Sequence, residues 1–335
     1  MQKIILFFAL FIAVTSCHHS KPASKYISNE GYIFGTVYHI TYESPEGKDF
    51  QQDVDNELHA LDMSLSTFKK ESILSKVNNN EPVKVDGFFT TVFKKSMEVS
   101  QKTDGAFDVT VAPLVNAWGF GFKAKQSVTP HLIDSLRSFV GYRKMRLVDS
   151  TIVKDDQRTM LDFSAIAKGY AVDVVGNLLH RMGCQNYMVE IGGEVVARGV
   201  NHEGVLWRIG INEPNDDEPL VPKHLQAIIS LDNKAVATSG NYRNFYIENG
   251  KKYAHTIDPS TGYPVNHNLL SATVIANNCM TADAYATACM VMGVKKALAM
   301  ASKNDEIEIF LIYADNEGEN NVAYSSGFEK LLLKE

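Results

Sequence analysis

An aspartate and a threonine near the C-terminal end of the chain have the spacing of a divalent-cation site. Asp283 and Thr287 lie in an alanine-rich segment, residues 281–288, and one helical turn separates them on one face. One carboxylate with one hydroxyl suits Mg²⁺, which takes few protein oxygens and completes its coordination with water and phosphate. A buried helix whose N-terminal aspartate is favoured by the helix dipole has the same pattern. On the spacing alone, this second interpretation is favoured.

Lys168 is a second candidate because it follows a strand-to-helix turn. The first N–H groups of a helix have no partner within the helix, so residues 162–170 would place free donors and an ammonium near one point, which suits an anion. Ser164 as the N-cap explains part of this pattern without a function. A lysine so near the start of a helix is normally disfavoured by the dipole, and this favours a functional role for Lys168.

His255 is a candidate general base at the end of a predicted strand. The loop that follows, residues 256–264, is rich in proline and glycine. This loop is also typical of a turn without catalytic function, so we interpret Asp258 as a turn residue rather than as a catalyst.

Two further segments place carboxylates beside small residues. Asp108 lies in residues 105–110, and Glu190 and Glu194 flank two glycines. Each segment fits either a ligand contact through the backbone or an ordinary tight turn.

Several common motifs are absent from the sequence. It contains no G-x-x-x-x-G-K-[ST], no H-E-x-x-H and no G-x-S-x-G. Gly119 and Gly121 form a G-x-G without the third glycine or a preceding strand. The usual nucleotide-binding and hydrolase explanations therefore fail.

The elements that must position these residues are mixed. A strand is expected at residues 32–42, a helix carries Val54, Leu58 and Leu61, and the clearest helix covers residues 164–182 with Gly183 at its end. Further helices are expected at residues 89–102, 130–139, 281–292 and 294–302. Further strands are expected at residues 187–191, 194–200, 207–211, 225–231, 270–276, 307–313 and 321–325, with a hairpin around Asn249 and Gly250. Because helices and strands do not alternate regularly, we expect one α+β unit that can form two lobes.

The N-terminus has the pattern of a bacterial lipoprotein signal. Lys3 precedes an apolar run at residues 4–14, which is too short to span a bilayer, and small residues precede Cys17. We therefore expect a signal peptide at 1–16, lipidated Cys17 with a tether at 17–30, and the catalytic domain at 31–335. An ordinary signal peptide with an incidental cysteine is the alternative. The expected location is the cell envelope outside the cytoplasm, at the inner or outer membrane.

Charge and cysteine content restrict the partners further. The net charge of −6 argues against nucleic acid. Cys184, Cys279 and Cys289 show no C-x-x-C spacing, so neither a disulfide framework nor a zinc site is indicated, although one bridge among them stays open.

These segments together resemble the FAD:protein FMN transferase family, the ApbE-type flavin-trafficking lipoproteins. The matching stretches are residues 66–68, 105–121, 162–170, 190–194, 237–244, 255–264 and 279–293. The resemblance implies a T-fold-like α+β architecture that binds FAD between two lobes.

The resemblance also implies a role for individual residues. It implies that FAD contacts Ala106, Phe107, Asp108, Asp162, Lys168 and Ile257. It implies that Mg²⁺ is held by Asp283, Thr287, the Ala165 carbonyl and the Ala286 backbone, with His255 as the base. Phe34 and Phe68 would contact the flavin or adenine, although family members often have Met at the first position and Tyr or Trp at the second.

The activity implied is transfer of FMN from FAD to a Ser or Thr hydroxyl of another protein, with release of AMP. Acceptors in the family carry a D-G-x-[ST]-G-A-T-type segment and include membrane redox-pump subunits. This chain lacks such a segment, so a separate protein is the expected acceptor. The alternatives are an FAD pyrophosphatase that gives FMN and AMP, and a non-catalytic flavin-binding lipoprotein; Asp283, Thr287 and His255 argue against the latter.

Overall fold

An antiparallel sheet of eight strands forms the centre of the protein in the computed structural model, which describes residues 25–123, 125–214, 224–241, 245–248 and 250–333. The strands lie in the order β1 (Lys25–Ile33), β2 (Thr36–Ser44), β5 (Tyr187–Ile191), β6 (Glu194–Arg198), β9 (Lys234–Gly240), β12 (Leu269–Ala276), β13 (Ile307–Ala314) and β14 (Asn320–Tyr324). Strands far apart in sequence are neighbours, because β6 pairs with β9 and β9 pairs with β12.

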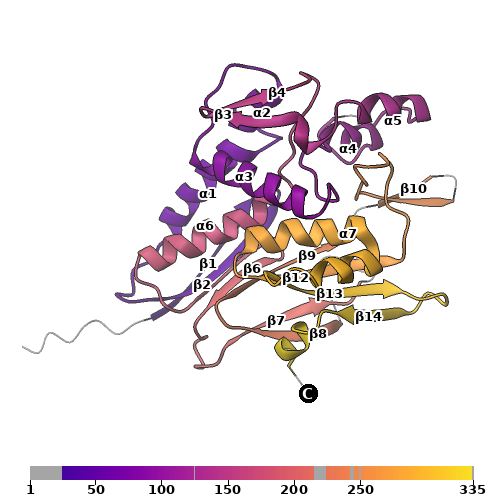
Figure 1. Cartoon of the computed structure of the whole chain (residues 1–335). Helices are drawn as coiled ribbons and strands as arrows, with labels where there is room; N and C mark the ends of the chain where they lie inside the picture. The colour runs from indigo at the N-terminus through magenta and orange to yellow at the C-terminus, as the bar shows by residue number, and fades with distance from the viewer. Residues whose placement is uncertain (1–24, 124, 215–223, 242–244, 249, 334–335) are drawn as a thin grey trace, which may run out of the picture.

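Three long helices cover one face of this sheet (Figure 1): α1 (Gln51–Leu65), α6 (Ala167–Arg181) and α7 (Cys279–Ala301). A fourth, α3 (Gly87–Lys102), packs on α1 and α7. α7 lies over β9 and β12, and α6 packs beside it over β5 and β6. The predicted stripe of Val54, Leu58 and Leu61 on α1 is fully buried, as expected for helices whose apolar faces meet a sheet.

The opposite face is covered by a two-stranded ribbon, β7 (Trp207–Asn212) and β8 (Leu225–Leu231), and by η2 (Phe328–Leu331). Trp207, Ile229, Phe310 and Phe328 belong to the apolar cluster on this side. The central strands are therefore buried on both faces, so their positions are firmly fixed.

Smaller elements lie beyond the helix layer, as the upper part of Figure 1 shows: α2 (Ile73–Asn78), α4 (Ala112–Trp118), α5 (Pro130–Arg137), η1 (Tyr142–Lys144), β3 (Met145–Val148) and β4 (Thr151–Lys154). The hairpin of β10 (Phe245–Glu248) and β11 (Lys251–Ala254) lies beside them. Leu114 and Trp118 pack with Ile133 and Ile257 in a separate apolar cluster. The loop after β11 is thus tied to α4 and α5.

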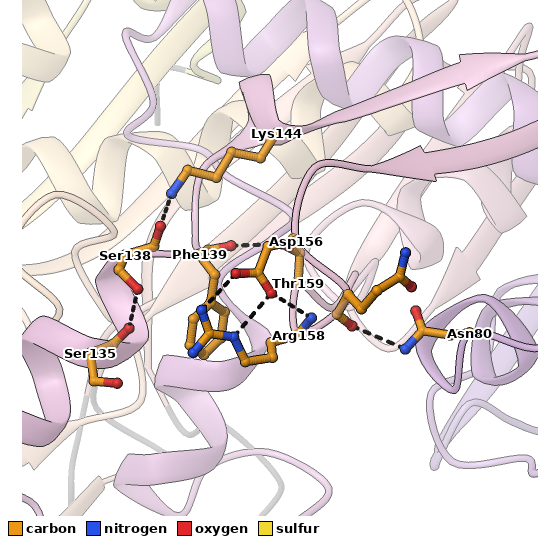
Figure 2. A network of polar contacts seen from close by, with 9 residues as sticks. Asn80, Ser135, Ser138, Phe139, Lys144, Asp156, Arg158 and Thr159 are labelled. Carbon is orange, nitrogen blue, oxygen red and sulfur yellow. Dashed lines mark hydrogen bonds and ion pairs between the residues drawn. The ribbon is translucent and has the colours of Figure 1, made fainter.

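A polar network fixes the segment that leads to Asp162 (Figure 2). The Thr159 hydroxyl donates to the Phe139 carbonyl at 2.8 Å. Arg158 pairs with Asp156 at 2.6 Å, and its guanidinium lies 4.4 Å from the centre of the Phe139 ring. Asn80, just after α2, donates to the backbone of the same loop at 3.1 Å. The path from β4 to α6 is therefore held from two sides.

The expected α+β class is confirmed, but two predictions at the N-terminal side of the domain are wrong. The single strand at 32–42 is two strands, since Phe34 and Gly35 have φ of 53° and 77° and form the tight turn between β1 and β2. Residues 25–30, assigned to the tether, belong to β1 and pair with β2. Residues 1–16, Cys17 and the rest of the tether lie outside the described residues.

The two helices that carry the site differ in detail from the prediction. α6 begins at Ala167 rather than at Ser164, because the Ser164 N–H and hydroxyl both donate to the Asp162 carboxylate in a turn before the helix. Ser164 is therefore not the N-cap. α7 contains both predicted C-terminal helices, separated by a break at Gly293, whose φ of 71° is not helical.

The structure also tests the predictions on the pairing of the cysteines and on the hairpin. Cys184, Cys279 and Cys289 are buried and unpaired. The hairpin expected around Gly250 is confirmed by the pairing of β10 with β11, while Asn249 lies outside the described residues. No helix in the described part of the chain is long and apolar enough to cross a membrane.

We predict that Gly169→Ala destabilises the protein. A Cβ at Gly169 would lie 2.4 Å from the Cys279 carbonyl oxygen and 2.7 Å from the Asp283 Cβ, where α6 and α7 meet. We expect a loss of about 1–3 kcal/mol in the free energy of unfolding, more than the gain from alanine's helix propensity. Urea denaturation measures it. The control is Gly87→Ala, since a Cβ there meets nothing within 4 Å; equal effects of the two substitutions would contradict the prediction.

Candidate functional site

A central cavity of about 490 Å³ brings together residues from most of the segments that the sequence singled out. Ten of the predicted site residues line it: Phe68, Ala106, Asp108, Asp162, Ala165, Lys168, His255, Ile257, Asp283 and Thr287. Its volume lies within the range of about 300–1,000 Å³ that is typical of small-molecule sites. Residues separated by more than two hundred positions thus meet in one space.

Three predicted residues lie elsewhere. Phe107 is 2% exposed and packs in the main core, and Ala286 is fully buried; neither lines the central cavity. Phe34 lines a neighbouring cavity of about 690 Å³. The two cavities share Phe68 and Lys168, together with Thr67 and Ser164, so they adjoin each other.

Asp283 and Thr287 lie one turn apart in the first half of α7 and both face the central cavity. The Gly169 N–H, at the start of α6, donates to Asp283 Oδ2 at 2.9 Å. The Thr287 hydroxyl lies 3.3 Å from that of Ser239 on β9. The bond from Gly169 uses only one of the two carboxylate oxygens.

This set of oxygen donors fits a magnesium ion. Asp283 supplies a carboxylate, Thr287 a hydroxyl, and Ala165 lines the same cavity, so hard oxygen donors are grouped as Mg²⁺ requires. Among the described residues, no group of three or more His, Cys, Asp or Glu side chains is placed to hold a metal. The fit therefore rests on one carboxylate with neutral oxygens, which is compatible with an ion that keeps several waters.

Lys168 is held as a charged group at the junction of the two cavities. Its Nζ lies 2.5 Å from Glu194 Oε1. Burial alone lowers the pKa of the ammonium, but the negative charges of Glu194 and Asp283 outweigh burial, so the pKa of Lys168 is raised above its ordinary value. Lys168 is therefore protonated at neutral pH.

Glu194 lines the central cavity but had no assigned role in the sequence analysis. Burial raises the pKa of its carboxyl, and Lys168 opposes this effect. The only signal in the sequence was the second acidic residue of the segment 190–194. Nothing in the local sequence distinguishes the two glutamates of this segment. In the structure Glu194 is buried, whereas Glu190 pairs with His39 on β2 at 2.8 Å.

His255 follows β11 directly and is half-buried in the cavity wall. The Phe120 ring lies edge-on to it, with 6.4 Å between ring centres, and stacks on Tyr246 at 5.2 Å. Tyr246 in turn stacks on Tyr253 at 5.3 Å. His255 is thus positioned by an aromatic wall and shares the cavity with Lys168 and Asp283.

Asp258 and Asp162 both shape turns. Asp258 Oδ1 accepts from the N–H and the hydroxyl of Ser260 at 2.8 and 2.6 Å, which confirms that it is a turn residue. Asp162 accepts in the same way from Ser164 at 2.8 and 2.5 Å, and it also lines the cavity.

Asp108 is a buried carboxylate that organises the cavity wall. It accepts from the N–H and hydroxyl of Thr110 at 2.8 and 2.6 Å and from the Tyr142 N–H at 2.8 Å. Burial raises the pKa of its carboxyl and these bonds oppose the rise. Asp108 therefore ties the segment 105–110 to η1.

Asp173 on α6 supports the start of α7 and was not identified from the sequence. Its carboxylate accepts from the N–H groups of Cys279 and Met280 at 2.7 and 2.8 Å. Burial raises its pKa to about 7 despite these bonds. α6 thus holds α7 through Gly169 and through Asp173, one turn farther along.

The fold and the cavity define an α+β protein in which a charged lysine, a group of oxygen donors and a histidine surround one space. The model of the ApbE family matches residues 34–311. FAD:protein FMN transferases from Vibrio cholerae and Haemophilus influenzae are 38% and 36% identical, over 100% and 99% of this chain and 100% and 99% of their own length.

Solved structures of ApbE proteins are similar to this chain in both fold and sequence. The flavin transferase ApbE from Vibrio cholerae has a TM-score of 0.82 at 38% identity and covers 92% of this chain and 100% of its own. The apo form of the Pseudomonas stutzeri flavinyl transferase ApbE has a TM-score of 0.83 at 33% identity and covers 92% and 97%. This chain belongs to the ApbE family.

We predict that Asp173 makes stability depend on pH. Its pKa is raised to about 7 in the folded protein from an ordinary value of 3.8. Between these values the folded state binds more protons than the unfolded state, so the free energy of unfolding falls as pH rises. Asp173→Asn is expected to flatten this fall between about pH 5 and pH 7, by up to about 1.4 kcal/mol per pH unit.

Urea denaturation at several pH values measures these slopes. The control is Asp305→Asn, at an exposed position just after α7. An Asp173→Asn slope equal to that of the unmodified protein would show that Asp173 keeps an ordinary pKa.

Proposed function

We propose that this protein is a Mg²⁺-dependent FAD:protein FMN transferase that moves FMN from FAD to a Ser or Thr hydroxyl of an acceptor protein and releases AMP. The observation that carries the proposal is the meeting of Lys168, His255, Asp283 and Thr287 in one cavity. The names of the relatives from Vibrio cholerae and Haemophilus influenzae support it.

FAD is long, and the two adjoining cavities suit such a ligand. Lys168 lines both cavities, so we place the pyrophosphate beside its ammonium and one end of FAD in each cavity. Phe68, which also lines both, is 78% exposed and offers a free ring face for stacking. Phe34 would meet the end of FAD that enters the second cavity.

The reaction requires charge neutralisation and a base. When bound at Asp283 and Thr287, Mg²⁺ supplies positive charge to the phosphates. Lys168 holds the pyrophosphate in place, and His255 accepts the proton from the acceptor hydroxyl. The hydroxyl oxygen forms a bond to the FMN phosphorus while the bond from that phosphorus to AMP breaks. Such transfers depend mainly on positioning and electrostatics.

The acceptor and the location complete the proposal. Cys17 would carry the lipid anchor and hold the enzyme in the cell envelope. The acceptor would carry a D-G-x-[ST]-G-A-T-type segment and belong to a membrane redox complex. A tether to the same membrane would raise the effective concentration of such an acceptor.

We predict that Asp283→Asn lowers FMN transfer at least about a hundredfold, because the cation loses its one carboxylate ligand. Asn keeps an oxygen for the Gly169 N–H, so the contact between α6 and α7 is retained. The assay mixes the protein, FAD, Mg²⁺ and an acceptor fragment and measures flavin fluorescence on the denatured acceptor.

The control is Asp305→Asn, at an exposed position. Full transfer by Asp283→Asn would contradict the assigned metal ligand. Free FMN and AMP from the unmodified protein, without labelled acceptor, would indicate a pyrophosphatase, and no product at all would indicate a binding protein.

We predict that His255→Ala lowers transfer by about 10²–10⁴-fold and leaves FAD binding within a few fold, since a general base acts on the acceptor hydroxyl and not on FAD. Single-turnover transfer and FAD titration measure the two quantities separately. His131→Ala, at an exposed position on α5, is the control. Parallel losses of binding and transfer would assign His255 to FAD binding instead.

A further inference from the structure

Two buried acidic residues of the central cavity, Glu194 and Asp108, have no part in the proposed chemistry, and both carboxylate oxygens of Asp108 already accept hydrogen bonds. Glu194 is different. It is the first residue of β6 and follows a turn in which Gly192 and Gly193 have φ of 62° and 101°. A Cβ at Gly192 would lie 2.8 Å from Thr36 Cγ2, so this turn packs closely against the start of β2. The backbone therefore fixes where Glu194 enters the cavity.

The two carboxylate oxygens of Glu194 have different surroundings. Oε1 accepts from Lys168 Nζ at 2.5 Å. Oε2 has no hydrogen-bond partner among the described residues. Water does not supply one from the surface, because the residue is only 3% exposed. A buried carboxylate oxygen without a donor is costly, so Oε2 is suited to a donor from a water or from a bound ligand.

The charges around Glu194 indicate which ligand this is. Lys168 on α6 shares the cavity with Asp283 on α7 and Glu194 on β6. Asp108 and Asp162 line it as well, so carboxylates outnumber the one ammonium. An excess of negative charge favours a cation with its waters over an anion. Mg²⁺ keeps several waters, and their hydrogens are the donors that Oε2 lacks.

We propose that Glu194 is a positioning residue for both halves of the site: Oε1 holds the Lys168 ammonium at the junction of the cavities, and Oε2 accepts a hydrogen bond from a water of the divalent cation at Asp283 and Thr287. This inference rests on the proposed function because it takes the cation site from it. Carboxylates in this outer position orient metal ligands and tune metal affinity.

The test compares Glu194→Gln with Glu190→Gln in binding experiments. Glu190 lies at the other end of the same turn, and its Oε1 accepts from the Gly193 N–H at 2.6 Å, so the control reports any disturbance of the turn. Isothermal titration with Mg²⁺ alone, and with FAD in the absence of metal, gives two dissociation constants for each protein.

Glu194→Gln is expected to change the two affinities in opposite directions. Mg²⁺ binding should weaken by about tenfold, because an outer acceptor is replaced by a neutral amide. Metal-free FAD binding should tighten by about fivefold, because Lys168 is no longer neutralised. Glu190→Gln should change neither. A purely structural role for Glu194 would weaken both affinities together.

A second set of variants separates the two tasks. In a Lys168→Gln background the ion pair is already broken, so Glu194→Gln should no longer tighten FAD binding. Glu194→Asp keeps the charge but withdraws it by one methylene from both Lys168 and the cation, so it should weaken Mg²⁺ binding and tighten metal-free FAD binding by less than Glu194→Gln does. If circular dichroism shows that Glu194→Gln is unfolded, Glu194→Asp provides the test of Mg²⁺ binding.

Unchanged Mg²⁺ affinity in folded Glu194→Gln, or equal effects of the Glu194 and Glu190 changes, would overturn the inference. These outcomes are distinct from failure of the proposed function. A protein that binds Mg²⁺ and FAD as expected but labels no acceptor would refute the transferase and leave the role of Glu194 intact.

Discussion

The close contact between the first turns of α6 and α7 is the constraint on which the rest of the site depends. Gly169 has no side chain, so the backbone of α6 reaches the Cys279 carbonyl, and its N–H donates to Asp283 at 2.9 Å. Asp173 fixes the first N–H groups of α7 from the same helix. Because this contact is rigid, Lys168 on one helix and Asp283 on the other face one cavity at a fixed separation.

The balance of charge in that cavity is compatible with the proposed function. Lys168 is paired with Glu194 and lies near Asp283, so its positive charge is compensated by carboxylates. Because carboxylates outnumber the one ammonium around the cavity, a divalent cation and a pyrophosphate would neutralise each other and the site together under the proposed function. Such ligands would also offset the cost of the buried carboxylates.

The wall of the cavity that carries His255 is built from aromatic rings rather than from charged groups. His255 follows β11 and rests against Phe120, whose ring stacks on Tyr246. Trp118 stacks on Tyr253 and donates to the Gly262 carbonyl, which ties the loop after His255 to α4. Aromatic packing therefore positions His255, the proposed base, whereas hydrogen bonds and ion pairs position Lys168 and Asp283. The cavity therefore has one wall of aromatic rings, which defines its shape, and one wall of charged groups.

Local patterns in the sequence determined the α+β class, most of the helices and strands, and several of the residues around the cavity, while the resemblance to a family supplied others such as Ala165 and Ile257. The period of Val54, Leu58 and Leu61, and the spacing of Asp283 and Thr287, are local properties of a helix and can be read without its neighbours.

Tertiary structure alone decided the rest. Phe107 is drawn into the core, Phe34 forms a turn with positive φ, and Glu194 on β6 reaches Lys168 on α6, the helix that packs on this strand. Gly169 meets Asp283 across 114 positions, and no short-range pattern encodes such a pairing. The sequence by itself specifies which side chains can do the chemistry, but the packing of α6 against α7 and β6 decides which of them face each other, because long-range contacts depend on the whole core.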